Sequence, residues 1–307
     1  MTGDFEQQRV KLSTGVELDV VDMGPRDAPV LIFLHGFPES HRTWRNQLVH
    51  FSDRFRCIAP DQRGYRGSSK PQEVDAYSPD KLIADVFALA DALGVGEFTI
   101  VGHDWGGAIS WGVALGGQPG GLHPQWAGRV TRAVIANAPH PGIFGRLLQV
   151  DPAQRAASQY IRMFRDPAND ALVREQGLAG LLAKAFEGRL EGAPTPPEEI
   201  ARSLADWQDR DTCFGMLNWY RASPIEVPAM DAPYAEPPAM PFPKLMIPTL
   251  VIWALDDVAL PPSNLDGMAE LVPNAAIVKV PGCGHFVTWE APDAVNAAID
   301  AFLASDG

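Results

Sequence analysis

The sequence predicts an α/β fold in which a mostly parallel central sheet is flanked by helices and interrupted by an inserted helical domain. Short apolar runs, typical of strands buried on both faces, alternate with helical segments in the first half of the chain. The pattern is then entirely helical from about residue 142 to 222, and strand-like runs return near residue 249. One strand also runs directly into a tight, glycine-flanked turn, which is typical of a sharp strand-to-helix bend.

The core elements follow in order along the chain. Weak alternation from about residue 8 to 22 indicates a β-hairpin that enters the sheet. Buried strands are expected at 29–34, 56–59, 98–101, 133–136, 249–253 and 276–280. Ser78 and Pro79 indicate the start of an amphipathic helix that ends at Gly94. Further core helices are expected at about 106–116 and 291–304.

The inserted segment forms a separate helical unit in this interpretation. Short helices are expected near 152–165, 170–187, 197–209 and 212–222. A proline-rich stretch, 224–248, leads back to the sheet as a linker. We therefore expect a core built from residues 1–141 and 245–307, with residues 142–244 as a helical cap or lid.

Composition limits the classes of function. The 307 residues suffice for one large core with a smaller insert, and the formal charge of −13 argues against nucleic acid or anionic membranes as partners. No apolar run approaches the roughly 20 residues of a membrane span, and the first residues lack a signal-peptide pattern. The three scattered cysteines favour a reducing cytoplasm over a disulfide framework.

Asp104 stands at the centre of the glycine-flanked turn, Gly102-His103-Asp104-Trp105-Gly106-Gly107. Such a nucleophile elbow pushes its central side chain up into a pocket. A carboxylate gains nothing by attacking an ester, because the anhydride formed would simply return. It can attack a saturated carbon that carries a leaving group, and water then cleaves the resulting alkyl-enzyme ester. Asp104 therefore indicates chemistry on epoxides or alkyl halides.

A histidine and an acid follow Asp104 in the chain order that this type of triad requires. Asp256 and Asp257 come after the expected strand 249–253, and His285 comes after 276–280, so all lie past carboxyl ends of strands. His285 would take a proton from water, while an aspartate orients it. We favour Asp257 for its spacing from Trp253; Asp256 stays open. No His or Cys ligand lies near these aspartates at metal-binding spacing, so no metal is expected.

Two further groups complete the predicted site. The backbone N–H groups of Phe37 and Trp105 can form an oxyanion hole for the tetrahedral intermediate of ester hydrolysis. The opening of an epoxide also needs a donor to the leaving ring oxygen. Tyr160 and Tyr220, both in the helical insert, suit this role because a tyrosine is neutral at pH 7 and donates one hydrogen bond.

The chain resembles the α/β-hydrolase-fold epoxide hydrolases, the soluble kind with a helical cap, over nearly its whole length. The motifs that carry the resemblance are His35-Gly-Phe-Pro38, Asp61-Gln-Arg-Gly-Tyr-Arg-Gly-Ser68, Gly102–Gly107 and Gly284-His285-Phe286. The resemblance implies that Tyr160 and Tyr220 are the ring-opening tyrosines, and that the enzyme needs an epoxide and water but no cofactor. Ala254 departs from the family's usual Trp-Gly pair at 253–254.

Two alternatives stay open. A dehalogenase could use the same Asp-His-Asp triad, but a haloalkane enzyme often has an Asn where Phe37 stands, and a haloacetate enzyme an Arg where Trp105 stands. A non-catalytic, ligand-binding relative would not need the complete triad. Six apolar side chains are expected to line the pocket and to favour an aryl or alkyl epoxide. They are Phe37, Trp105, Phe164, Leu217, Trp219 and Phe286.

Overall fold

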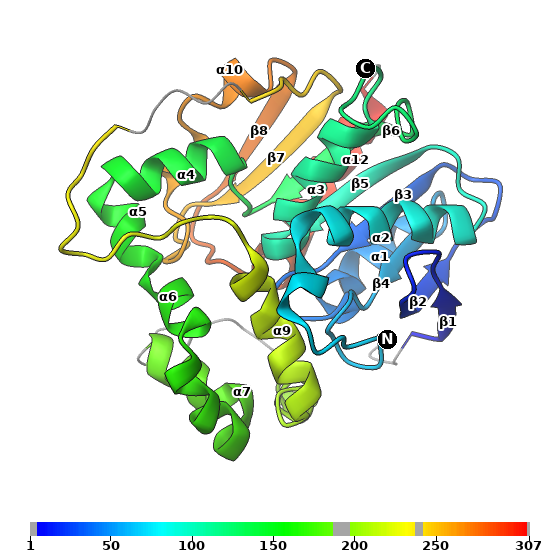
Figure 1. Cartoon of the computed structure of the whole chain (residues 1–307). Coiled ribbons are helices and arrows are strands. Elements are labelled where there is room, and N and C mark those ends of the chain that lie inside the picture. Colours follow the sequence, from blue (N-terminus) through cyan, green and yellow to red (C-terminus); the bar gives the residue numbers. More distant parts are fainter. Residues whose placement is uncertain (1–4, 187–196, 237–241, 306–307) are drawn as a thin grey trace.

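A computed structural model describes residues 5–186, 197–236 and 242–305 of the chain. In these residues eight strands form one sheet, in the order β1-β2-β4-β3-β5-β6-β7-β8 (Figure 1). The strands are β1 (Gln7–Lys11), β2 (Glu17–Met23), β3 (Val30–Leu34), β4 (Arg56–Pro60), β5 (Phe98–His103), β6 (Val130–Ala136), β7 (Thr249–Ala254) and β8 (Ala275–Val280). The pairs β1–β2 and β2–β4 are antiparallel, while the others are parallel. The predicted mostly parallel α/β sheet is confirmed.

Alternate residues of the central strands enter two different hydrophobic cores. In β3, Ile32 and Leu34 face the core that includes helices α2 (Pro79–Ala92) and α3 (Asp104–Gly117). Leu31 and Phe33 face the opposite core, which includes α1 (Arg45–Phe51) and α12 (Pro292–Ala304). Because both faces are covered, these strands are apolar without interruption, as parallel sheets require.

The remaining core helices are short. They are η1 (His41–Trp44), η2 (Val74–Tyr77), η4 (Pro262–Leu265), α10 (Met268–Leu271) and α11 (Val287–Glu290). Helix α3 begins at Asp104 itself, two residues earlier than expected, so β5 passes into the helix without a loop. Ser78 precedes α2 as expected, but its side chain makes no capping hydrogen bond, and Pro79 occupies the first turn.

The segment between β6 and β7 is helical up to Ala222, as predicted, while the described part of the expected linker 224–248 contains no helix. Its elements are α4 (Pro141–Val150), α5 (Pro152–Ala157), α6 (Gln159–Arg165), η3 (Pro167–Asn169), α7 (Asp170–Phe186), α8 (Pro197–Asp206) and α9 (Arg210–Ala222). Figure 1 shows α6, α7 and α9 grouped away from the sheet layer. The single helix expected at 152–165 is wrong in detail, because the chain breaks at Ser158 into α5 and α6. Residues 237–241 of the expected linker lie outside the described residues.

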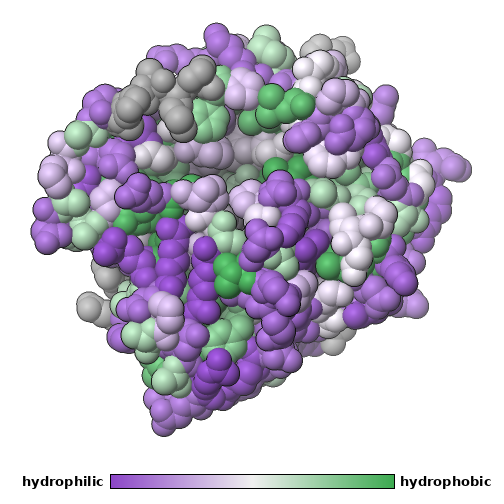
Figure 2. All heavy atoms as spheres, viewed as in Figure 1, coloured by the Kyte–Doolittle hydropathy of each residue, from purple (hydrophilic) through white to green (hydrophobic). Residues whose placement is uncertain are grey.

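The face shown in Figure 2 is mostly hydrophilic, with apolar side chains in small separated groups. Scattered exposed apolar residues are ordinary on a folded protein. Within the described ranges, no helix has both the length and the apolar character needed to traverse a lipid bilayer.

Candidate active site

The elbow holds Asp104 in a left-handed backbone conformation, with φ at 50°. The neighbouring glycines are required by close approach. A Cβ on Gly106 would lie 2.2 Å from the carbonyl oxygen of Leu34, and one on Gly102 would lie 2.5 Å from that of Gly106. A non-glycine residue in this conformation is strained and persists only where the surrounding structure imposes it. The turn thus places a carboxylate at the carboxyl end of β5, at the start of α3.

The two carboxylate oxygens of Asp104 face different partners. The backbone N–H of Phe37 donates to Oδ1 over 2.7 Å. Oδ2 lies 3.4 Å from Nε2 of His285. Because Phe37 follows β3 directly in the chain after His35-Gly36, the β3 loop supplies the donor and the β8 loop supplies the histidine. One oxygen is therefore held by a main-chain donor, while the other faces the ring of His285.

Asp257 is the acid that meets the histidine. Its Oδ2 lies 2.7 Å from Nδ1 of His285, and its side chain is fully buried. Asp256 is exposed, and its backbone N–H donates to the carbonyl oxygen of Cys283 instead. The structure therefore brings Asp104, His285 and Asp257 together and leaves Asp256 outside this cluster.

Opposing influences act on the pKa values of this cluster. Burial alone would raise the pKa of Asp104, but the hydrogen bond and charge of His285 outweigh it, so the pKa lies below its usual value. Burial alone would lower the pKa of His285, yet the charges of Asp257 and Asp104 raise it well above its usual value. Asp104 is consequently ionised and can attack without a base.

The two tyrosines come from the helical insert. Tyr160 lies in α6 and Tyr220 in α9, and their ring centroids are 6.1 Å apart. The ring of Tyr220 meets those of Phe37 at 4.9 Å and Trp105 at 5.0 Å, so it lies directly over the elbow. Burial and the charge of Asp104 raise the pKa of both hydroxyls. Both tyrosines thus keep their protons, and a protonated tyrosine hydroxyl is able to donate a hydrogen bond.

The residues predicted to line the pocket differ in what they contact. Phe164 packs against Phe37 at 5.2 Å between ring centroids, and Phe286 packs against His285 at 5.2 Å. Leu217 lies in α9 itself and is completely buried in the same hydrophobic core as α2 and α3. Phe164 therefore lies beside the residue that donates to Asp104, and Phe286 lies beside His285.

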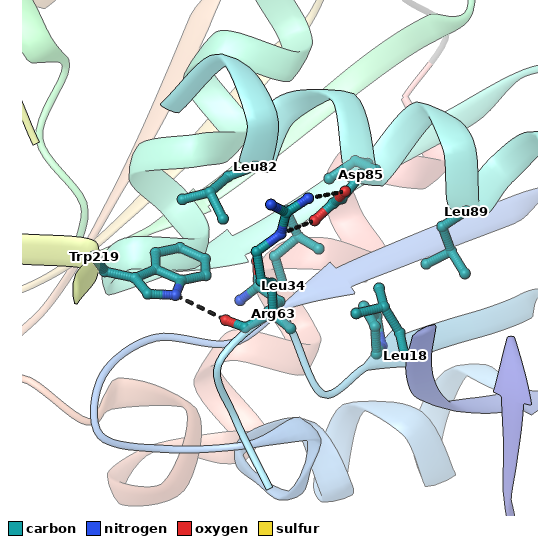
Figure 3. Close-up of a pocket in the computed structure, with 10 residues that line it drawn as sticks. Leu18, Leu34, Arg63, Leu82, Asp85, Leu89 and Trp219 are labelled. Carbon is teal, nitrogen blue, oxygen red and sulfur yellow. Dashed lines mark hydrogen bonds and ion pairs between the residues drawn. The ribbon is translucent and has the colours of Figure 1, made fainter. Parts of the chain in front are cut away.

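Trp219 packs against Trp105, with their ring centroids 6.0 Å apart. Its indole N–H donates to the carbonyl oxygen of Arg63 over 2.9 Å (Figure 3). It lines a cavity of about 10 Å³ together with Arg63 and Asp85, which form a buried two-bond ion pair. Such a volume holds about one water molecule, so this cavity does not admit an organic substrate.

Two side chains near the triad, Glu39 and Asn137, escaped prediction from the sequence. His103 faces Glu39 through Nδ1 at 3.0 Å and the carbonyl oxygen of His285 through Nε2 at 2.8 Å. Asn137 donates to Oδ2 of Asp257 over 2.8 Å. A signal existed for each: Glu39 follows the His35–Pro38 motif, and Asn137 comes directly after an expected strand. In the part of the chain that the structure describes, no group of acidic, His and Cys side chains is arranged to hold a metal ion.

Comparison with known proteins agrees with this geometry. Residues 29–292 match the family model of the alpha/beta hydrolase fold. The AB hydrolase superfamily protein YfhM of Bacillus subtilis is 31% identical over 293 residues, covering 95% of this chain and 96% of the relative. Epoxide hydrolase A of Mycobacterium tuberculosis is 29% identical, covering 96% and 97%. The chain therefore belongs to the alpha/beta hydrolase fold family.

Solved structures narrow the relationship to one branch of this family. One, described as a novel epoxide hydrolase from metagenomes of hot environments, is 67% identical with a TM-score of 0.92, covering 99% of this chain and all of that one. An epoxide hydrolase of Bacillus megaterium, solved with an inhibitor, is 29% identical with a TM-score of 0.82, covering 97% of this chain and all of that one. The resemblance to epoxide hydrolases is thereby confirmed, and the dehalogenase alternative is not favoured.

Proposed function

We propose that the protein hydrolyses epoxides to vicinal diols through a covalent alkyl-enzyme ester on Asp104. The observation that carries this proposal is the pair of contacts at one carboxylate. Oδ1 accepts from the backbone N–H of Phe37, while Oδ2 faces His285 beneath the two tyrosines. An ionised carboxylate placed opposite two neutral donors suits the opening of a strained ether.

In the first half-reaction, Oδ2 of Asp104 attacks the less hindered carbon of the epoxide. The carbon–oxygen bond of the ring breaks as the ester bond forms. Tyr160 and Tyr220 donate hydrogen bonds to the departing oxygen, which takes a proton from one of them and becomes a hydroxyl. That tyrosine regains its proton from water, and His285 takes no part in this half-reaction.

In the second half-reaction, His285 removes a proton from water, and the hydroxide attacks the carbonyl carbon of the ester. Asp257 stabilises the imidazolium that forms. The negative charge develops on Oδ1, where the N–H groups of Phe37 and Trp105 form the oxyanion hole. Collapse of the intermediate releases the diol, whose oxygen takes the proton from His285, and leaves Asp104 as a carboxylic acid. Asp104 then loses its proton to solvent, which replaces the proton that water gave to the tyrosine and restores the carboxylate. No step requires a metal or an organic cofactor.

The surroundings support finer parts of the proposal. We assign residues 142–244 as a cap that carries both tyrosines over the core. The aromatic rings of Phe37, Trp105 and Phe164 around the elbow favour an aryl or alkyl epoxide. Three buried cysteines without disulfides support a reducing cytoplasm as the site of action, and the charge of −13 argues against a nucleic-acid partner.

The test is to trap the ester in a His285→Gln variant supplied with styrene oxide. Mass spectrometry of the denatured protein should show an adduct equal in mass to the whole epoxide, on the peptide that contains Asp104. A His285→Gln, Asp104→Ala double variant should form none. The absence of an adduct across epoxides of graded size would refute the proposal, and halide release from haloalkanes or haloacids would support a dehalogenase instead.

A further inference from the structure

Asn137 occupies an unusual position at the end of β6. It is completely buried, and its φ of 41° lies in the left-handed region. Among the described residues, only Arg66 and Asp104 are other non-glycine residues with positive φ. Asn tolerates this conformation better than most residues, and such strained positions cluster at functional sites.

The side chain of Asn137 has only one possible orientation. Its Oδ1 accepts from the backbone N–H of Ala254 over 2.9 Å, and its Nδ2 donates to Oδ2 of Asp257 over 2.8 Å. A backbone N–H only donates, so the amide oxygen must face Ala254 and the amide N–H must face Asp257. The side chain therefore joins the carboxyl ends of β6 and β7 and supplies a donor to the acid.

This donor completes the hydrogen bonding of Asp257. Oδ1 accepts from the backbone N–H groups of Ala259 and Leu260, at 2.8 and 3.0 Å. Oδ2 accepts from Asn137 and faces Nδ1 of His285 at 2.7 Å. With donors on both oxygens, the carboxylate cannot rotate without losing hydrogen bonds that are stronger than ordinary ones because they involve a charged group.

We infer that Asn137 is a positioning residue for the hydrolytic half of the reaction, because it holds Oδ2 of Asp257 against His285. This inference rests on the proposed function. The attack of Asp104 on the epoxide does not use His285, so alkylation proceeds without Asn137. Hydrolysis of the ester needs His285 in the correct orientation, so loss of Asn137 slows this step alone and the alkyl-enzyme accumulates.

Two substitutions suit the left-handed backbone. Asn137→Asp keeps the shape and the acceptor for Ala254 but replaces the donor with an oxygen. Asn137→Gly removes the side chain and relieves the strain. Rapid mixing with styrene oxide, followed by acid quench and mass spectrometry, measures both half-reactions in the full chain. We expect alkylation within about threefold of the wild type and hydrolysis slower by about 10- to 100-fold, the usual effect of losing an outer hydrogen-bond partner.

Asn264 provides a matched control. It is equally buried, and its Nδ2 donates to Oε1 of Gln154 and the carbonyl oxygen of Pro261, neither of which is a triad residue. Asn264→Asp also removes a buried donor, so it should lower the melting temperature without changing the ratio of the two rates. Both Asn137 variants should instead raise the steady-state fraction of alkyl-enzyme.

The outcomes separate this inference from the proposed function. If His285→Gln traps the ester but both Asn137 variants slow the two half-reactions equally, or slow neither, Asn137 is not a positioning residue. If His285→Gln forms no ester, the proposed function itself is wrong. Circular dichroism identifies a variant that fails to fold, and the second substitution at position 137 then decides.

Discussion

His103 donates from its Nε2 to the main-chain carbonyl oxygen of His285 over 2.8 Å, because a carbonyl oxygen only accepts. Its Nδ1 faces Oε2 of Glu39 at 3.0 Å, and both of these side chains are almost fully buried. Glu39 also accepts from the hydroxyl of Thr43 over 2.6 Å. The residue before Asp104 thus fixes the loop that carries His285, and the buried carboxylate of Glu39 holds His103 in place.

We predict that Glu39→Gln lowers the free energy of unfolding by about 2–3 kcal/mol, because it breaks a buried hydrogen-bonded pair. Urea denaturation at neutral pH measures the change. Glu236→Gln is the control, since Glu236 pairs with Arg146 on the surface and its side chain is 62% exposed. An exposed pair contributes less than about 1 kcal/mol. If the two substitutions lowered the free energy of unfolding equally, the buried pair would contribute no more than the exposed pair, and this prediction would be wrong.

The two tyrosines should act in alkylation and not in hydrolysis. Tyr160→Phe and Tyr220→Phe remove the hydroxyls but keep the rings, so each should slow alkylation, and the double variant should slow it by roughly 10²- to 10⁴-fold, the usual range for general acid catalysis. Stopped-flow tryptophan fluorescence follows this step. Tyr77→Phe is the control, because the hydroxyl of Tyr77 is bonded to the carbonyl oxygen of Pro71, outside the site. A double variant with an intact alkylation rate would exclude the tyrosines.

Ester formation should lower the pKa of His285. In the free enzyme the charges of Asp257 and Asp104 oppose the effect of burial and raise this pKa. Alkylation neutralises Asp104, so one of the two raising charges disappears and the imidazolium loses its proton more readily. We predict that single-turnover hydrolysis rises with pH around a midpoint below the pKa of His285 in the free enzyme, measured by NMR. A midpoint equal to or above that value would contradict this coupling.

Asp61 should contribute stability that acid removes. Burial would raise its pKa, but the charge and hydrogen bond of His41, with the charge of Arg66, hold the pKa well below its usual value. A group with a depressed pKa in the folded state stabilises the fold above its unfolded-state pKa of about 3.9, and this contribution is lost as the pH falls. Asp61→Asn should therefore be less stable than the wild type at pH 7, and the gap measured by urea denaturation should narrow from pH 5 to pH 3. A gap that stays constant would exclude this role.

The sheet and the elbow were predictable because their signals are local. Strands buried on both faces are continuous apolar runs, as in β7, where every residue is buried. Asp104 stands two positions from Gly102 and from Gly106, where a Cβ would lie within 2.5 Å of neighbouring atoms, and the chain order of the triad then points to His285 and Asp257. These features depend on neighbours in the sequence, so the sequence alone reveals them.

The missed contacts join residues that are distant in the chain. Asn137 and Asp257 are 120 positions apart, and Glu39 and His103 are 64 apart. The periodic spacing of hydrophobic residues predicts local helices and strands, but it carries no information about such distant pairs. Trp219 shows a second limit of prediction from sequence. The side chains of adjacent helical residues point about 100° apart. Because Tyr220 lies over the elbow, Trp219 points in another direction, and its indole N–H reaches the carbonyl oxygen of Arg63. The sequence alone does not show that the indole N–H of Trp219 bonds to a main-chain oxygen 156 positions away.

A single turnover in water enriched in ¹⁸O tests the central claim most directly, with enzyme in excess over epoxide. Attack by Asp104 places one of its own oxygens in the first diol, while the oxygen of water enters the carboxylate. We predict label in the peptide that contains Asp104 and none in the diol. Label that passes straight into the first diol, with an unlabelled Asp104, would show that water attacks the epoxide directly and would contradict this account.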